Sequence, residues 1–148
     1  MQLAREVMID ARPEALWALL WDVPRMAACV PGCSEAQEVT AHRTYRAHLA
    51  QKVGPISLSV PVTVEITAAA PPHHLALTAS GRDPVVGTEI AMRLTLDCEA
   101  VATGTRLRIG AEGHVLGKVG ALGHAIVQRR AEETLDEFGR RLARELGD

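Results

Sequence analysis

Aromatic residues are scarce in this chain of 148 residues, where Trp17, Trp21, Tyr45 and Phe138 make up only 3% of the sequence. The core must therefore consist mainly of Val, Leu, Ile, Met and Ala, because hydrophobic residues form 47% of the chain. A composition this apolar is typical of a globular protein and not of a disordered one. At this length we expect one domain that spans residues 1–148.

Several other features are missing, and each absence excludes a class of protein. No apolar run approaches the ~20 residues of a membrane-spanning helix, and the N-terminus lacks the pattern of a secretory signal. The net charge of −2 argues against a nucleic-acid-binding surface, which needs clustered basic residues. Three cysteines are too few for a disulfide scaffold. We therefore expect a cytoplasmic protein with free thiols that does not bind nucleic acid.

The N-terminal third of the chain predicts one strand followed by two short helices. Apolar and polar residues alternate imperfectly over residues 2–11, which favours a strand. Pro13 suits the first turn of a helix, and the residue before Pro24 disfavours helical backbone, so a second helix is expected over residues 24–28.

The rest of the chain changes from a strand period to a helix period. Five segments alternate with period two and predict an antiparallel meander with one apolar face: residues 44–53, 58–67, 75–81, 90–98 and 107–115. Apolar residues then recur at a spacing of three to four, which predicts a helix over residues 120–146 that is roughly 40 Å long. We expect no strand to match that length, so the sheet must curl around the helix. This order predicts an α+β helix-grip fold, with a curved antiparallel sheet of about six or seven strands.

Four short motifs carry a family resemblance in addition to this order of elements. They are VPGC at Val30–Cys33, VGPI at Val53–Ile56, GTRL at Gly104–Leu107 and GKVGALG at Gly117–Gly123. With their spacing, the chain resembles the carbon monoxide dehydrogenase G-subunit (CoxG) family of the START-like (SRPBCC) superfamily, over residues 1–146.

The resemblance implies a non-catalytic carrier. Members of that family are linked to molybdenum-containing carbon monoxide dehydrogenases, to recruitment of that enzyme to the membrane, and to a quinone in an apolar pocket. Some members carry a C-terminal extension that reaches the membrane. The present sequence ends two residues after the predicted helix, so we expect membrane contact that is at most peripheral.

The predicted inner face of the sheet offers little chemistry. Its polar or reactive groups are Gln51, Cys98 and Tyr45, whereas the carboxylates fall on the opposite face by the same alternation. Catalysis needs a nucleophile or an acid–base pair in a sheltered space, so we do not expect an enzyme. Cys29 and Cys33 lie four residues apart without the second ligand pair of a zinc site, so neither a metal nor a cofactor is expected.

Three hypotheses about function follow. We favour a binding protein for an apolar small molecule, such as a quinone or lipid. The glycines at the helix entry either let the helix and sheet approach closely or form a flexible gate. The second is a maturation or recruitment factor with a filled core that acts through protein contacts. The third is an enzyme of the polyketide cyclase or hydrolase type. Predicted pocket residues are Leu58, Val60, Val62, Leu77, Met92, Leu94, Ile109, Leu122 and Ile126, and the predicted gate residues are Gly117, Gly120 and Gly123.

Overall fold

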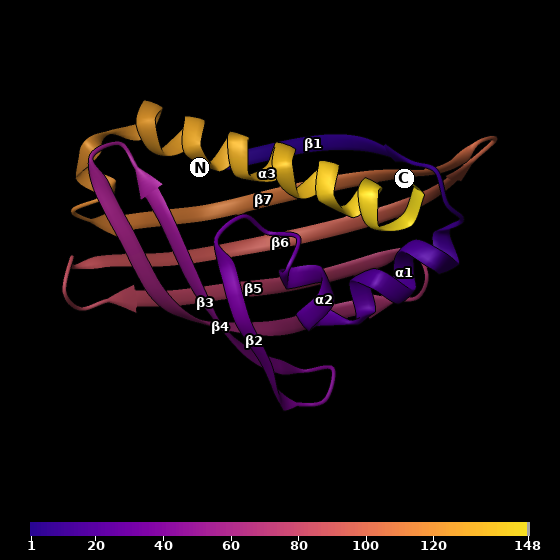
Figure 1. Cartoon of the computed structure of the whole chain (residues 1–148), viewed down its shortest axis with the longest axis horizontal. Coiled ribbons are helices and arrows are strands. Elements are labelled where there is room, and N and C mark those ends of the chain that lie inside the picture. The colour runs from indigo at the N-terminus through magenta and orange to yellow at the C-terminus, as the bar shows by residue number, and fades with distance from the viewer. Residues whose placement is uncertain (148) are drawn as a thin grey trace.

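A computed structural model describes residues 1–147 as one curled sheet that holds a long helix (Figure 1). The seven strands form a single antiparallel sheet in the order β1-β7-β6-β5-β4-β3-β2, which confirms the predicted helix-grip architecture. The elements, in chain order, are β1 (Gln2–Ile9), α1 (Pro13–Trp21), α2 (Val23–Ala27), β2 (Cys33–Thr40), β3 (Thr44–Val53), β4 (Ile56–Ala70), β5 (His74–Asp83), β6 (Thr88–Val101), β7 (Gly104–Gly117), the 3₁₀ turn η1 (Gly120–Leu122) and α3 (His124–Gly147).

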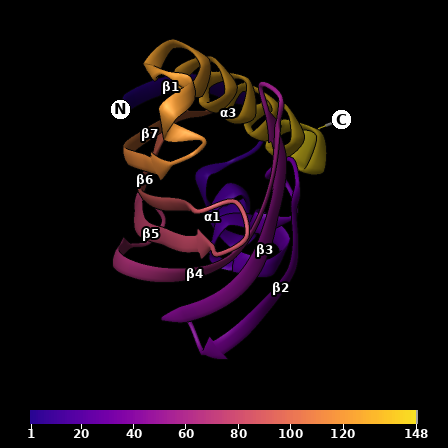
Figure 2. The same cartoon turned by 90° about the vertical axis from the view of Figure 1, so that its left-hand side faces the viewer.

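The sheet forms a trough, and α3 lies along its open side. Seen from the end, the strands curve from β1 round to β3, and α3 lies between these two (Figure 2). The helix packs mainly on β1 at one edge of the sheet and also contacts β3 near the other edge. The short helices α1 and α2 lie at the end of the trough that is close to the C-terminus of α3 (Figure 1).

The curl begins in β4, which changes partners along its length. Residues 56–65 pair with β3, whereas residues 62–70 pair with β5. Before Val62 the β5 side of β4 is unpaired, and here Pro61 has no N–H to satisfy. The N–H of Ser59 instead donates to the carboxylate of Asp83, which is buried in the structure. A proline and a buried aspartate thus let the two strands separate without an unsatisfied backbone donor.

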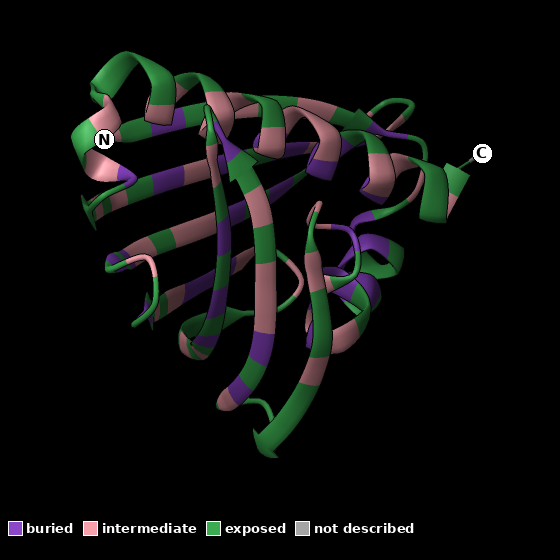
Figure 3. Cartoon of the chain, turned by 60° about the vertical axis from the view of Figure 1, so that its left-hand side comes forward, coloured by how far each residue is buried: buried purple, intermediate pink, exposed green. Residues whose placement is uncertain are grey.

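Alternation along the strands places the core inside the trough, as the changing colours of Figure 3 show. On β3, for example, Tyr45, Ala47 and Val53 are buried, whereas Arg46 and Lys52 are exposed. Phe138 of α3 is also fully buried. It belongs to the same core cluster as Tyr45 and Trp17, so these rings lie where the helix and the sheet meet the short helices.

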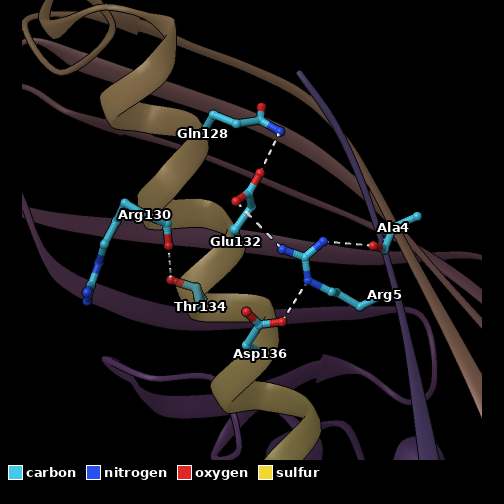
Figure 4. A network of polar contacts seen from close by, with 7 residues as sticks. All are labelled: Ala4, Arg5, Gln128, Arg130, Glu132, Thr134 and Asp136. Atoms are coloured by element: carbon cyan, nitrogen blue, oxygen red, sulfur yellow. Dashed lines mark hydrogen bonds and ion pairs between the residues drawn. The ribbon is translucent and has the colours of Figure 1, made fainter.

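Two contacts fix α3 on β1. Gly139 lies so close to β1 that a Cβ atom there would be 2.6 Å from Cγ2 of Val7. Beside it, Nε of Arg5 donates to Oδ1 of Asp136 over 2.7 Å, and Nη2 of Arg5 lies 3.7 Å from Oε2 of Glu132 (Figure 4). Glycine therefore allows a close approach, and one arginine bridges two helical turns at the edge of the contact.

The structure corrects three details of the expected fold. The strand β2 was not predicted as a separate segment. It lies exposed at the edge of the sheet and is irregularly paired, so its sequence has no regular apolar alternation. Gly123 separates η1 from α3, so the helix begins at His124 and not at residue 120. At 15 residues β4 spans about 50 Å, which exceeds the roughly 36 Å of the 24-residue α3. The trough thus follows from partner exchange in β4 and not from a helix longer than the strands.

Candidate functional site

An apolar cavity of about 260 Å³ lies between α3 and the inner face of the sheet. All seven strands, α2 and α3 contribute to its wall. The alanines in this wall matter because they leave space where larger residues would fill it: Ala27, Ala47, Ala79, Ala111 and Ala131. An engineered apolar cavity of about 150 Å³ is enough to bind benzene, so this one has room for a substituted ring or part of an aliphatic chain.

The structure brings five of the nine predicted pocket residues together in the cavity wall. These are Leu58, Val62, Leu77, Met92 and Leu94.

The other four predicted residues do not line the cavity. Val60 and Ile109 face inward but are covered completely by the packed side chains around them. Leu122 and Ile126 lie at the β3–β4 turn, where a Cβ on Gly54 would be 3.5 and 3.6 Å from their methyl carbons. Ile126 is 42% exposed there. Alternation identifies the inner face, but it does not show which part of that face remains uncovered.

One group of polar side chains interrupts the apolar wall where β3 meets α3. Nε2 of Gln51 donates to the carbonyl of Pro31 over 2.9 Å and to Oγ1 of Thr134 over 3.3 Å. Thr134 in turn donates to the carbonyl of Arg130, one helical turn earlier. Arg93 also borders the cavity, but its guanidinium pairs with Glu112 and its side chain is 58% exposed.

Comparison with known proteins supports the resemblance in the sequence. The model of the carbon monoxide dehydrogenase G-subunit family, CoxG, matches residues 6–147. The chain belongs to the CoxG family. No curated protein sequence matches it.

Solved structures similar to this CoxG chain share its fold at low sequence identity. A conserved protein from Geobacillus kaustophilus is 20% identical, with a TM-score of 0.86 over 98% of this chain and 94% of its own. CV1439 from Chromobacterium violaceum is 14% identical, with a TM-score of 0.74 over 100% and 99% of the two chains. The AHSA1 protein SPO3351 from Silicibacter pomeroyi is 18% identical, with a TM-score of 0.68 over 98% and 96%. These likenesses confirm the helix-grip fold and say nothing further about ligands.

The cavity wall of this CoxG protein offers little for acid–base or nucleophilic chemistry. Within residues 1–147, the cavity is bordered by no carboxylate and no histidine. Its one thiol belongs to Cys33, and burial raises the pKa of that thiol, so it stays protonated at neutral pH. Protonated thiols are poor nucleophiles.

The other two thiols lie away from the cavity. Sγ of Cys29 is 3.8 Å from the carbonyl of Arg25 and donates to it within α2 and the turn that follows. Burial raises the pKa of Cys98 to about 11, with a smaller contribution from the nearby carboxylate of Asp97. In the described part of the chain no three His, Cys, Asp or Glu side chains are grouped as metal ligands.

The three glycines predicted to form a gate differ in their surroundings. A Cβ on Gly117 would overlap the carbonyl of Gly87, and one on Gly120 would lie 2.4 Å from the carbonyl of Val115, so neither position has room for a side chain. Gly123 has φ 105° and ψ 153°, with open space around the Cβ position. Of the three, Gly123 alone combines a backbone conformation that favours glycine with open space at the Cβ position. Within residues 1–147, no helix is both long and apolar enough to cross a membrane.

Sequence reasoning placed Gln51 on the inner face but missed Arg130 and Thr134. The sequence assigns Arg130 to the solvent-facing side of the helix. The missed signal is spacing, since Arg130 and Thr134 lie four residues apart, as do Val127 and Ala131, and both pairs flank the main apolar stripe of α3. A helix covered by a curved sheet on two sides buries a wider face than a single stripe.

Proposed function

We propose that this CoxG protein is a non-catalytic binding protein for an apolar small molecule, a quinone or a lipid. The observation that carries the proposal is the cavity of about 260 Å³ with a wall of aliphatic side chains under α3. Burial of an apolar ligand there gains roughly 25 cal/mol for each Å² removed from water. An unfilled apolar cavity with no acid–base pair is better suited to holding a molecule than to transforming it.

The size of the cavity limits the part of the ligand that it encloses. Pockets for drug-sized ligands usually measure about 300–1,000 Å³, and this one is slightly smaller. It is large enough for a quinone ring with short substituents or for several methylene groups of a lipid. We therefore expect the ring or chain end to be enclosed and any longer tail to leave between α3 and the β3–β4 turn, with Gly123 as the hinge of a gate.

Membership of the CoxG family supports a partner as well as a ligand. We propose that the protein serves a molybdenum-containing enzyme of the carbon monoxide dehydrogenase type, to which it delivers or from which it takes the ligand. Membrane contact that is at most peripheral and a cytoplasmic location both stay predictions from the sequence.

The two alternative functions explain the cavity less well. A recruitment factor that acts only through protein contacts would not need the unfilled space. A cyclase or hydrolase would need ionisable groups that the described wall does not provide.

Two measurements test the proposal. Native mass spectrometry of gently purified protein should reveal a bound apolar molecule. Titration of delipidated protein should saturate with a short-chain benzoquinone that is substituted at every ring position and therefore cannot add to the Cys33 thiol. Cys33 supplies a site-specific reading because it borders the cavity, whereas Cys98 is buried elsewhere. A bound quinone should slow alkylation of Cys33 by N-ethylmaleimide, whereas Cys98 should stay unlabelled in native protein with or without the quinone. Absence of both a co-purified molecule and saturable binding would refute the proposal.

The partner requires its own experiment. Affinity capture from the native host, followed by identification of a molybdenum enzyme among the bound proteins, should succeed with the wild type. Capture of that enzyme by a protein that binds no apolar molecule would favour the recruitment hypothesis. Turnover of a bound ligand by the isolated protein would favour the enzyme hypothesis.

A further inference from the structure

The helix α3 is held to the two sides of the trough by unequal contacts. It packs mainly on β1, where Gly139 allows a close approach and Nε of Arg5 donates to Asp136 over 2.7 Å (Figure 4). On the opposite side, within residues 1–147, a single hydrogen bond joins the helix to β2, β3 or β4: Nε2 of Gln51 donates to Oγ1 of Thr134 over 3.3 Å. Separation of α3 from the sheet therefore breaks fewer interactions on the β3 side than on the β1 side.

The cavity reaches the surface of the protein on this weaker side, along a line between α3 and the Val30–Cys33 turn that we call the β3 seam. On the helix side of the seam, Arg130 borders the cavity while its Nη1 lies 3.5 Å from Oε2 of Glu133, a side chain that is 57% exposed. On the sheet side, both ends of the turn border the cavity, and the turn leads into β2, the edge strand. A molecule that crosses the seam therefore passes from the cavity to solvent without crossing a strand of the sheet.

Gln51 spans the seam with an amide that is bound more firmly to the sheet side. Its Nε2 donates to the carbonyl of Pro31 over 2.9 Å, a shorter bond than the one to Thr134. The turn is fixed on β3, because the N–H of Ala50 donates to the carbonyl of Gly32. Thr134 in turn keeps a partner within its own helix, the carbonyl one turn earlier. Rupture of the bond between Gln51 and Thr134 thus leaves each side chain with a hydrogen-bond partner, so opening the seam avoids the cost of an unsatisfied donor.

We infer that the apolar ligand enters and leaves the cavity across the β3 seam, and that the hydrogen bond from Gln51 to Thr134 is the latch that closes it. This inference rests on the proposed binding function and adds the route of exchange. The latch is formed in the closed protein with and without ligand, so it cancels from the equilibrium affinity and acts on the rates of entry and release. Gln51 is therefore a positioning residue that controls exchange.

The first experiment separates rates from affinity. The probe is N-phenyl-1-naphthylamine, an apolar dye that fluoresces when it leaves water and that the fully substituted benzoquinone should displace. Equilibrium titration gives its Kd, and stopped-flow mixing gives its rates of association and dissociation. Gln51→Met and Thr134→Val each remove the latch and keep the size of the side chain, whereas Thr134→Ser keeps the hydroxyl. The matched control is Gln128→Met, because Gln128 lies on α3 and does not border the cavity.

We expect Gln51→Met and Thr134→Val each to raise both rate constants about fivefold, the effect of losing one neutral hydrogen bond from the closed state. Their Kd should change by less than about twofold, because the latch is absent from the free and the bound protein alike. Thr134→Ser and Gln128→Met should match the wild type. Unchanged rates in the first two variants, or a change in Kd with no change in the association rate, would refute the latch.

The second experiment tests the route itself by closing one side of α3 at a time. In protein whose three native cysteines are replaced by alanine, the pair Gln51→Cys and Thr134→Cys is joined across the seam by a short bismaleimide with a cleavable disulfide spacer. The control pair, Arg5→Cys and Asp136→Cys, joins α3 to β1 in the same way. Probe loaded before cross-linking should stay trapped behind the first link, leave when the spacer is reduced, and exchange freely in the control.

The failures of the two proposals are distinguishable. Free release past the link across the seam would refute the route, and trapping by the control link alone would place the route on the β1 side. If the wild type binds neither the probe nor the quinone, the proposed binding function fails and this inference fails with it.

Discussion

The cavity makes a quantitative prediction for the substitution Ala79→Leu. Ala79 lies in the middle of the cavity wall, and its neighbours across β4 and β6, Val64 and Met92, also line the cavity. Leucine would add three carbons to unfilled space. At ~0.8 kcal/mol for each buried carbon the gain is about 2.4 kcal/mol, and leucine loses roughly 0.5–1 kcal/mol of side-chain entropy. We therefore expect the ligand-free variant to be about 1.5 kcal/mol more stable.

Urea unfolding and thermal unfolding both measure this effect. For a domain of this size, a change of about 1.5 kcal/mol corresponds to a rise in Tm of roughly 3–6 °C. The matched control is Ala4→Leu, because Ala4 is exposed on β1 and the same carbons gain no burial there. Its stability should change by less than about 0.5 kcal/mol.

The same variant should lose ligand binding. A saturating quinone stabilises a protein that binds it only in the folded state, so it should raise the Tm of the wild type and of Ala4→Leu but not that of Ala79→Leu. A fall of about 1–3 kcal/mol in the stability of Ala79→Leu would be the signature of overpacking. That result would refute the reasoning, because it would mean that the space beside Ala79 is already filled.

Three further predictions concern groups outside the cavity. Because burial raises the pKa of Cys98 to about 11, iodoacetamide at pH 8 should leave Cys98 unmodified in native protein and label it after unfolding, as peptide mass spectrometry can show; rapid native labelling would contradict this. The N–H groups of Val86, Ser59 and Val85 hold the pKa of Asp83 below its usual value. Asp83 should therefore add stability above about pH 4 that is lost as the pH falls through its folded-state pKa, so the gap between wild type and Asp83→Asn in urea unfolding should close at acidic pH; a constant gap would argue against ionisation as the cause. Gly139→Ala should destabilise the protein by about 1–3 kcal/mol through overlap with Val7, although alanine is the better helix former. Combined with Val7→Ala, it should cost less than the two single changes together, and strict additivity would show that the contact does not matter.

Much of the fold was predictable because the periodicities of the sequence are strong. One-sided burial forces alternation in β3 to β7, and α3 has an apolar stripe above a charged face. The strand β2 lacked such a signal, since it has register shifts and Glu35 adopts a positive φ of 56°. An irregular strand with few buried positions leaves no regular apolar pattern, so it can be identified only once its neighbour β3 is in place.

The candidate site was predictable only in part. Alternation placed Leu58 and Met92 on the inner face, and both line the cavity. It gave the same status to Val60 and Ile109, which other side chains cover. The position of Arg130 was not predicted for a different reason, because a charged residue on a helix is normally exposed to solvent. Its position at the cavity rim depends on how far the sheet wraps around α3, and that depends on the partner exchange in β4.

The cavity also bears on the choice between a carrier and a purely structural partner. Aliphatic side chains that line an unfilled space of about 260 Å³ lose packing contacts, which lowers the stability of the protein relative to a filled core. Alanines at positions 47, 79, 111 and 131 maintain the space, although a larger aliphatic residue at one or two of them would fill much of it. A recruitment factor would gain stability from such residues and lose nothing, whereas a carrier would lose its function. The stability that the unfilled space costs therefore favours a carrier, in which a bound ligand fills that space.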